Sequence, residues 1–267
     1  MTPAHLETYI DGLQKTLKDK LFFVDVLGKD FFKNKIIIDF GCGDGTVLEY
    51  IARNCNVESS YLFGVDIDER MVDYTVERLS KIPNVSWRVC CVLDRVVDSL
   101  KIMKSNREVV FIANSVFHEL NDDQHRIYDF IKTECDYLIV RDMYVHQKKV
   151  PEKKINEMLS QIVVNSNPRL FAQFGLKYGF SLRSLIHYLL KYTYVENWET
   201  ELEENYLSVD WNAINRIFSN VIHDNCYIQK WRLNRVKFDF VIDLSKYTTT
   251  THRELILSKK KERHYDF

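Results

Sequence analysis

Long apolar runs are absent from this sequence of 267 residues. No stretch approaches the roughly 20 consecutive apolar residues of a membrane-spanning helix, and the polar N-terminal segment lacks the apolar core of a secretory signal. The formal net charge is only −1 at pH 7, so no excess of positive charge draws the chain to nucleic acid or to an anionic membrane. The composition is that of a folded, soluble protein.

Cysteine pairs of the CxxC kind are also absent, although the chain has 6 cysteines. Most of them lie in apolar, strand-like segments, which is typical of reduced thiols buried in a core. No spacing typical of metal ligands is present either. The sequence therefore predicts an intracellular, cytoplasmic protein with no metal site.

Strands and helices alternate between residues 35 and 143. The strands are expected at 35–40, 60–67, 85–93, 108–115 and 135–143, and the helices at 46–54, 69–82, 94–104 and 121–134. Apolar residues at three- and four-residue spacing predict a further helix before residue 34. This alternation predicts an α/β fold with a parallel sheet that is covered by helices on both faces.

The alternation ends after residue 143. Residues 151–208 show only helical patterns, and we expect another helix at 210–224 and strands at 226–235 and 252–260. The predicted organisation is an N-terminal helical extension at 1–34 and one domain at 35–267, with a helical insertion at 151–208 that covers the ligand edge of the sheet. Aromatic residues should form the core of this insertion, and its glutamates make one face acidic.

Glycine is scarce, yet three of the 8 glycines fall within five positions after the first strand: Gly41, Gly43 and Gly45. A sharp turn from strand to helix needs positive φ and close backbone approach, which glycine provides. Such a turn also directs helix N–H groups toward a ligand at the carboxyl end of the sheet. Asp39 precedes the first glycine, and an acid there suits a ligand with an amino group better than a pyrophosphate.

The segment "IIDFGCGDG" resembles the first motif of the class I S-adenosylmethionine-dependent methyltransferases. Two further landmarks follow in the family's order: Asp66 in "FGVDIDERM" and the run "NSVFHEL" at 114–120, which is similar to the family's N-x-V-L-H-H-L. The resemblance spans about residues 30–145, and 210–260 fit more loosely. It implies a seven-stranded, mostly parallel, Rossmann-like sheet, S-adenosylmethionine as the cofactor, and methyl transfer as the reaction.

The resemblance also implies roles for single residues. Asp39 and the glycine loop would hold the methionine part of the cofactor, and Asp66 would hold the ribose. Where the family usually has Gly-Asp near the adenine, this sequence has Cys90-Cys91, so neighbouring groups or Asp94 would make that contact. The predicted cofactor-binding residues are Asp39, Gly41, Cys42, Gly43, Asp66, Ile67, Met71, Cys91, Val92 and Asn114.

His118 and Glu119 are the predicted catalytic residues, because they follow strand four where the transferred methyl group should lie. A neutral histidine can take a proton from a hydroxyl or ammonium acceptor. The alternative is a structural histidine that packs or caps the next helix, since alignment of the acceptor often suffices for this transfer. Arg141 and Asp142 could orient an anionic substrate or form a structural ion pair.

The sequence thus predicts methyl transfer to an oxygen or nitrogen of a small molecule, with no membrane partner. The acidic insertion favours a cationic or neutral acceptor over nucleic acid. One alternative is an enzyme that modifies RNA or protein and uses basic residues near the C-terminus, Lys230, Arg232, Arg235 and Lys237. The other is a module that binds the cofactor without catalysis.

Overall fold

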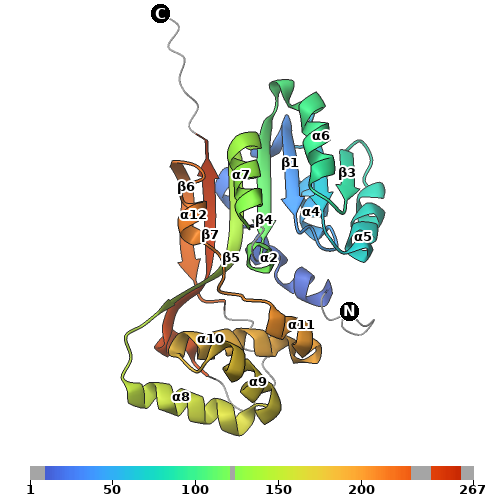
Figure 1. The fold of residues 1–267 in the computed structure, drawn as a ribbon. Coiled ribbons are helices and arrows are strands. Elements are labelled where there is room, and N and C mark those ends of the chain that lie inside the picture. The colour runs from blue at the N-terminus through green and yellow to red at the C-terminus, as the bar shows by residue number, and fades with distance from the viewer. Residues whose placement is uncertain (1–9, 121–123, 230–241, 260–267) are drawn as a thin grey trace, which may run out of the picture. The chain divides into compact units, whose positions relative to one another are not determined.

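The computed structural model describes residues 10–120, 124–229 and 242–259 (Figure 1). Its seven strands form one sheet in the order β3-β2-β1-β4-β5-β7-β6. The strands are β1 (Lys35–Phe40), β2 (Tyr61–Val65), β3 (Ser86–Cys90), β4 (Glu108–Asn114), β5 (Tyr137–Gln147), β6 (Asn220–Tyr227) and β7 (Thr248–Ser258).

The sheet is mostly parallel, as predicted. Strands β1 to β5 pair in parallel with one another along the order β3-β2-β1-β4-β5. Strand β7 runs antiparallel to β5, because Lys148 N donates to Tyr247 O at one end and Lys259 N donates to Asp136 O at the other. The carboxyl ends of the parallel strands therefore meet at one edge of the sheet.

The helices fall close to their predicted places between the strands. Helices predicted at 46–54, 69–82 and 94–104 are found as α4 (Thr46–Asn54), α5 (Glu69–Ser80) and α6 (Asp94–Met103). The helix predicted at 121–134 is α7 (Gln124–Glu134), and residues 121–123 lie outside the described part. The remaining helices are α2 (Leu17–Lys20), α3 (Phe22–Leu27), α8 (Glu152–Asn165), α9 (Pro168–Tyr178), α10 (Leu182–Lys191), α11 (Trp198–Glu203) and α12 (Trp211–Ile214).

Helices cover both faces of the parallel strands, because side chains alternate between the two faces. On one face, Ile37, Ile112 and Ile139 pack in a core with residues of α3 and α4. On the other face, the ring of Phe111 lies 5.9 Å from that of Phe130 on α7, and Figure 1 shows α6 and α7 together in front of the sheet. In the described part of the chain, no helix has both the length and the apolar character needed to span a membrane.

The helix predicted at 210–224 is wrong beyond its first turn. Helix α12 ends at Ile214, and β6 begins at Asn220. Buried Ile214, Ile217 and Phe218 have helical spacing, which explains the error. The strand predicted at 252–260 begins earlier, at Thr248, and residues 230–235 of the other predicted strand lie outside the described part.

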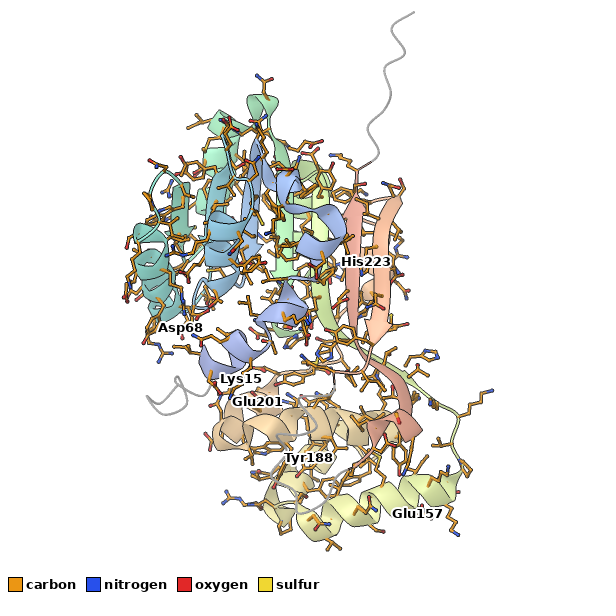
Figure 2. All side chains as sticks on the ribbon, turned by 180° about the vertical axis from the view of Figure 1, so that it is seen from behind. Lys15, Asp68, Glu157, Tyr188, Glu201 and His223 are labelled. Carbon is orange, nitrogen blue, oxygen red and sulfur yellow. The ribbon has the colours of Figure 1, made fainter. Side chains whose placement is uncertain are left out.

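The chain divides into two compact units, of which the smaller contains Met143–Val209 and Asn225–Arg253. Its core is aromatic, and Tyr188, Trp198 and Tyr206 are buried in it (Tyr188 is labelled in Figure 2). Buried Lys191 donates to the backbone oxygen of Glu201, whose carboxylate accepts from the Tyr206 hydroxyl. The predicted boundary at residue 34, and the covering role of residues 151–208, stay predictions.

Candidate active site

The glycine loop joins β1 to α4, and all three of its glycines have positive φ: 71° at Gly41, 53° at Gly43 and 77° at Gly45. Its N–H groups bond within the protein. Gly41 N and Cys42 N donate to Val65 O, and Gly43 N donates to Asp66 Oδ2 at 2.8 Å. These three loop donors are therefore already paired, and the prediction that the N–H groups of the following helix point toward a ligand stays a prediction.

We expect Gly45→Ala to destabilise the protein more than Gly43→Ala. Both substitutions put alanine at positive φ, which costs about 1–2 kcal/mol. A Cβ at Gly45 would lie 2.9 Å from the backbone Cα of Thr75, whereas one at Gly43 would meet only the end of the Leu13 side chain, also at 2.9 Å. Overpacking against backbone should add about 1–3 kcal/mol. Urea unfolding of both variants measures the difference; equal losses would mean that α5 shifts to make room.

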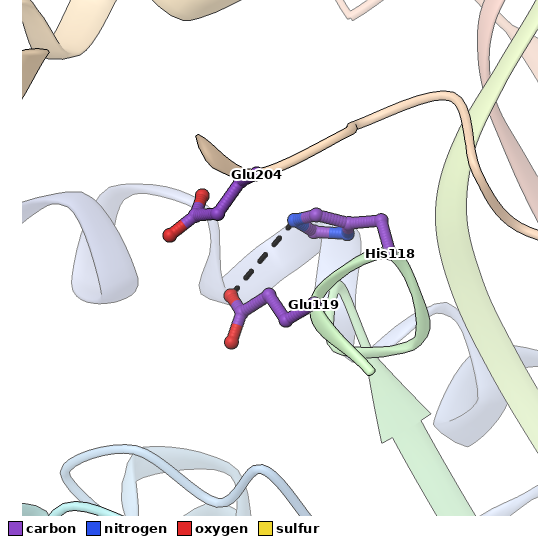
Figure 3. A group of neighbouring side chains, drawn as sticks. All are labelled: His118, Glu119 and Glu204. Atoms are coloured by element: carbon purple, nitrogen blue, oxygen red, sulfur yellow. Dashed lines mark ion pairs between the residues drawn. The ribbon is translucent and has the colours of Figure 1, made fainter. Parts of the chain in front are cut away.

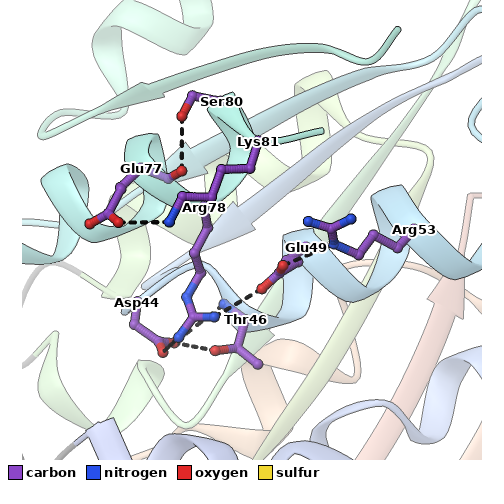
Figure 4. A network of polar contacts seen from close by, with 8 residues as sticks. All are labelled: Asp44, Thr46, Glu49, Arg53, Glu77, Arg78, Ser80 and Lys81. Atoms are coloured by element: carbon purple, nitrogen blue, oxygen red, sulfur yellow. Dashed lines mark hydrogen bonds and ion pairs between the residues drawn. The ribbon is translucent and has the colours of Figure 1, made fainter. Parts of the chain in front are cut away.

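Asp44, the acid inside the glycine motif, anchors the loop rather than facing a ligand. Its Oδ1 accepts from the Thr46 hydroxyl at 2.6 Å, and its Oδ2 accepts from Arg78 on α5 at 2.6 Å. Arg78 also donates to Glu49, which bonds Arg53 (Figure 4). Burial acts to raise the pKa of Glu49, but the hydrogen bonds from the two arginines outweigh it and lower the pKa.

Two buried side chains at the carboxyl ends of β1 and β4 have polar atoms without a hydrogen-bond partner: Asp39 Oδ2, and both Oδ1 and Nδ2 of Asn114. Asp39 is only 2% exposed, and burial raises its pKa to about 7, although the positive charge of Lys20 opposes the rise. Unpaired buried polar atoms are rare in folded proteins. A ligand with an ammonium group could donate to Asp39 Oδ2 and Asn114 Oδ1. An acceptor on the same ligand could take the hydrogen bond from Asn114 Nδ2.

Asp66 lies beyond the end of β2, beside the same loop. Besides Gly43 N, its carboxylate accepts from Asp68 N at 3.0 Å. Burial raises the pKa of Asp66, and these two backbone hydrogen bonds oppose the rise. A carboxylate has about four acceptor positions, so Asp66 can still accept from a pair of hydroxyls.

Apolar side chains are exposed on the loops after β2 and β3. Ile67 is 91% exposed and Val92 is 50% exposed, and Cys91, which follows the last residue of β3, is half-buried. These positions could pack against a flat aromatic ring. Asp94 is less suited to that contact, because both its oxygens accept from Arg126.

Two predicted cofactor residues have side chains that face the core. Cys42 is buried, and its thiol lies 3.7 Å from the Thr75 hydroxyl; burial raises its pKa well above the ordinary value. Met71 is 2% exposed in the first turn of α5. Any contact from Cys42 to a ligand must therefore come from its backbone.

His118 lies in a short 3₁₀ turn, Phe117–Glu119, that follows β4. Its Nδ1 lies 2.7 Å from Asp142 Oδ1, and Asp142 Oδ2 accepts from Phe117 N at 2.9 Å. On the other side of the ring, Nε2 lies 3.8 Å from Glu119 Oε1 (Figure 3). In a neutral imidazole that donates from Nδ1 to the Asp142 carboxylate, Nε2 would carry the lone pair.

Helix α7 holds this turn in place. Gln124 Nε2 donates to Phe117 O at 3.0 Å, and the Tyr128 hydroxyl donates to Gln124 Oε1 at 2.9 Å. Burial raises the pKa of Tyr128, with a further contribution from the charge of Asp142. Helix α7 thus holds the backbone of the turn, and Asp142 of β5 holds the imidazole ring.

Arg141 and Asp142 do not act together on one group, because neighbours in a strand point to opposite faces. Asp142 bonds His118, whereas Arg141 Nη1 donates to Ser115 Oγ at 2.9 Å and its Nη2 lies 3.9 Å from Asp19 Oδ2. Sequence reasoning missed the bond between Asp142 and His118. The pairing of β4 with β5 could have indicated it, since it places their ends side by side.

Residues 37–160 match the family model described as a methyltransferase domain. Among solved structures, a SAM-dependent methyltransferase from Anabaena variabilis aligns at 11% identity over 96% of this chain and 95% of its own, with a TM-score of 0.49. A phosphoethanolamine N-methyltransferase from Haemonchus contortus aligns at 13% identity over 91% and 53%, with a TM-score of 0.44.

The small RNA methyltransferase HEN1 also aligns, at 10% identity over 91% of this chain and 26% of its own, with a TM-score of 0.45. No curated protein sequence matches this chain. Alignments with identities and scores this low carry no argument about the family or the acceptor of this chain. The basic residues Lys230, Arg232, Arg235 and Lys237 lie outside the described part of the chain.

Proposed function

We propose that this chain is a class I S-adenosylmethionine-dependent methyltransferase that methylates an oxygen or nitrogen atom of a small molecule, because residues 37–160 match the methyltransferase-domain model and the sheet has seven strands. The observation that carries this proposal is the buried His118, whose Nδ1 lies 2.7 Å from Asp142 Oδ1. A fixed neutral imidazole is useful for an acceptor that must lose a proton, such as a hydroxyl or an ammonium group.

The residues at the strand ends fit the cofactor. Asp39 Oδ2 and Asn114 have unpaired buried polar atoms, which suit the ammonium group of the methionine part. Asp66 would accept from the ribose hydroxyls, and exposed Ile67 and Val92 would pack against the adenine. When bound, S-adenosylmethionine supplies an electrophilic methyl group on a positively charged sulfur.

In the proposed mechanism, the protein aligns the acceptor and removes its proton. His118 Nε2 would take the proton that the acceptor loses when it is methylated, and Asp142 would stabilise the imidazolium that results. The electron pair of the broken carbon–sulfur bond would stay on the sulfur of the cofactor. Glu119, half-exposed and 3.8 Å from Nε2, would orient the acceptor. This division of roles makes Asp142 a positioning residue and His118 the base.

A small acceptor is favoured over nucleic acid by charge. The chain has 37 lysines and arginines against 38 acidic residues, whereas proteins that bind nucleic acid usually carry a clear basic excess. Within the smaller unit, Glu199 is exposed and would repel a phosphate backbone. RNA or protein as the acceptor is the alternative that the experiment must exclude.

Transfer of a labelled methyl group tests the acceptor class. The full chain is incubated with methyl-labelled S-adenosylmethionine and a cell extract separated into small molecules, RNA and protein. We expect label in the small-molecule fraction, and a His118→Ala protein as control should transfer far less. Label that is confined to RNA or to protein would overturn the proposal while leaving the cofactor assignment intact.

A further inference from the structure

The N-terminal segment packs on the same face of the sheet as the unpaired polar groups. Leu17, Phe22 and Phe23 pack in the core that contains Ile37 and Ile112. Because side chains alternate along a strand, Asp39 and Asn114 lie on this same face, two residues beyond those isoleucines. Arg141 follows Ile139 of the same core in the same way.

The segment also covers the glycine loop. Helix α2 packs against α4, which starts directly after that loop. A Cβ at Gly43 would lie 2.9 Å from Leu13 Cδ1, and Asp19 Oδ2 lies 3.9 Å from Arg141 Nη2 at the end of β5. The last turn of α2, with Asp19 and Lys20, therefore lies at the carboxyl edge of the sheet.

We propose that Lys20 binds the carboxylate of the cofactor's methionine part, an inference that rests on the cofactor use in the proposed function. The methionine part carries both an ammonium and a carboxylate group. Asp39 and Asn114 suit the ammonium, but Asp39 and Asp66 would repel the carboxylate, which thus needs a cation beside the acids.

Two cations, Arg141 and Lys20, are candidates for binding this carboxylate, and they differ in their surroundings. Arg141 is 1% exposed, donates to Ser115, and has Asp19 beside it to balance its charge. Lys20 is partly exposed on the last turn of α2. Burial raises the pKa of both Asp39 and Asp66, and the positive charge of Lys20 opposes that rise at each of them. Lys20 stands next to Asp19 on the last turn of α2, and Asp19 Oδ2 lies 3.9 Å from Arg141 Nη2 at the end of β5. This position on the fold makes Lys20 the better candidate.

Calorimetry with two ligands separates this role from a structural one. S-adenosylmethionine carries the carboxylate, and decarboxylated S-adenosylmethionine lacks it but keeps the ammonium. We expect Lys20→Met to weaken binding of the first by roughly 10- to 100-fold, the usual worth of a charge-assisted hydrogen bond, and to leave the second unchanged. Lys20→Arg should retain most of the affinity for both ligands.

Lys18 on the same helix is exposed, so Lys18→Met is the matched control and should bind both ligands like the wild type. The unmodified protein should itself bind the decarboxylated ligand more weakly, by about the factor that Lys20→Met loses. Equal weakening of both ligands in Lys20→Met would overturn the proposal. Failure of the unmodified protein to bind S-adenosylmethionine would instead overturn the cofactor assignment.

Discussion

Replacing Asp39 by asparagine should weaken cofactor binding and, at the same time, stabilise the cofactor-free protein at neutral and alkaline pH. Asp39 is 2% exposed, with one carboxylate oxygen unpaired. The variant would lose the proposed charge-assisted hydrogen bond to the cofactor's ammonium group, a kind of bond that contributes about 1.5–3 kcal/mol. It also loses a buried charge that destabilises the folded state.

The stability effect follows from the pKa of Asp39, which burial raises from 3.8 to about 7. A raised pKa means that the folded state holds this proton more tightly than the unfolded chain does. The resulting stability is complete below about pH 4 and is lost as the pH rises through about 7. The difference corresponds to at most about 4 kcal/mol, at 1.36 kcal/mol for each pKa unit.

Denaturant unfolding of both proteins between about pH 4 and pH 8 measures this effect. The two proteins should be similar at the acid end, and Asp39→Asn should be the more stable at the alkaline end. Asp94→Asn, an exposed acid paired with Arg126, is the control and should show no such divergence. If Asp39→Asn unfolds more easily than the wild type at pH 8, the carboxylate is stabilised by a partner and is not an unsatisfied ligand group.

Replacing His118 by alanine should lower the single-turnover rate by about 10²–10⁴-fold with little change in cofactor affinity. The loss reflects the missing proton acceptor at Nε2. Asp142→Asn should lower the rate by a smaller factor, because an amide can bond Nδ1 in either tautomer and no longer stabilises the imidazolium. The rate of the wild type should also fall on the acid side, since a protonated imidazole cannot accept a proton.

Rapid-quench measurements with saturating cofactor test these expectations, and calorimetry shows whether each variant still binds it. Because His118 is 4% exposed, His118→Asn is needed as a second variant that keeps a polar side chain in place. Glu119→Gln should be milder if Glu119 only orients the acceptor. If both His118 variants keep rates within a few-fold of the wild type, His118 has a structural role and is not the base.

The sequence predicted the parallel half of the sheet well, because its strands are buried on both faces and read as unbroken apolar runs such as Ile36–Ile38. It failed at β6, whose residues are mostly exposed on both faces. Such a strand has no alternation to detect. It forms because its backbone pairs with β7, which is a tertiary effect that local patterns do not contain.

Some residues of the candidate site could be predicted from the sequence, and others could not. Asp39, Asp66 and Asn114 could be placed from the sequence because each follows a strand whose position was clear. The partner of His118 and the position of Lys20 could not. Both depend on which elements become neighbours in space, Asp142 through the β4–β5 pairing and Lys20 through the packing of α2 against α4.

The strand order has a consequence for how the chain reaches its native state. β7 is the last strand to be synthesised, yet it lies between β5 and β6. Until residues 248–258 are available, the edge of β5 has no neighbour, and an unpaired strand edge is a template for aggregation. Pairing over about a hundred residues of sequence is also slow, because a large loop must close first. Truncation before Thr248 should therefore yield aggregation-prone chains rather than a smaller folded sheet.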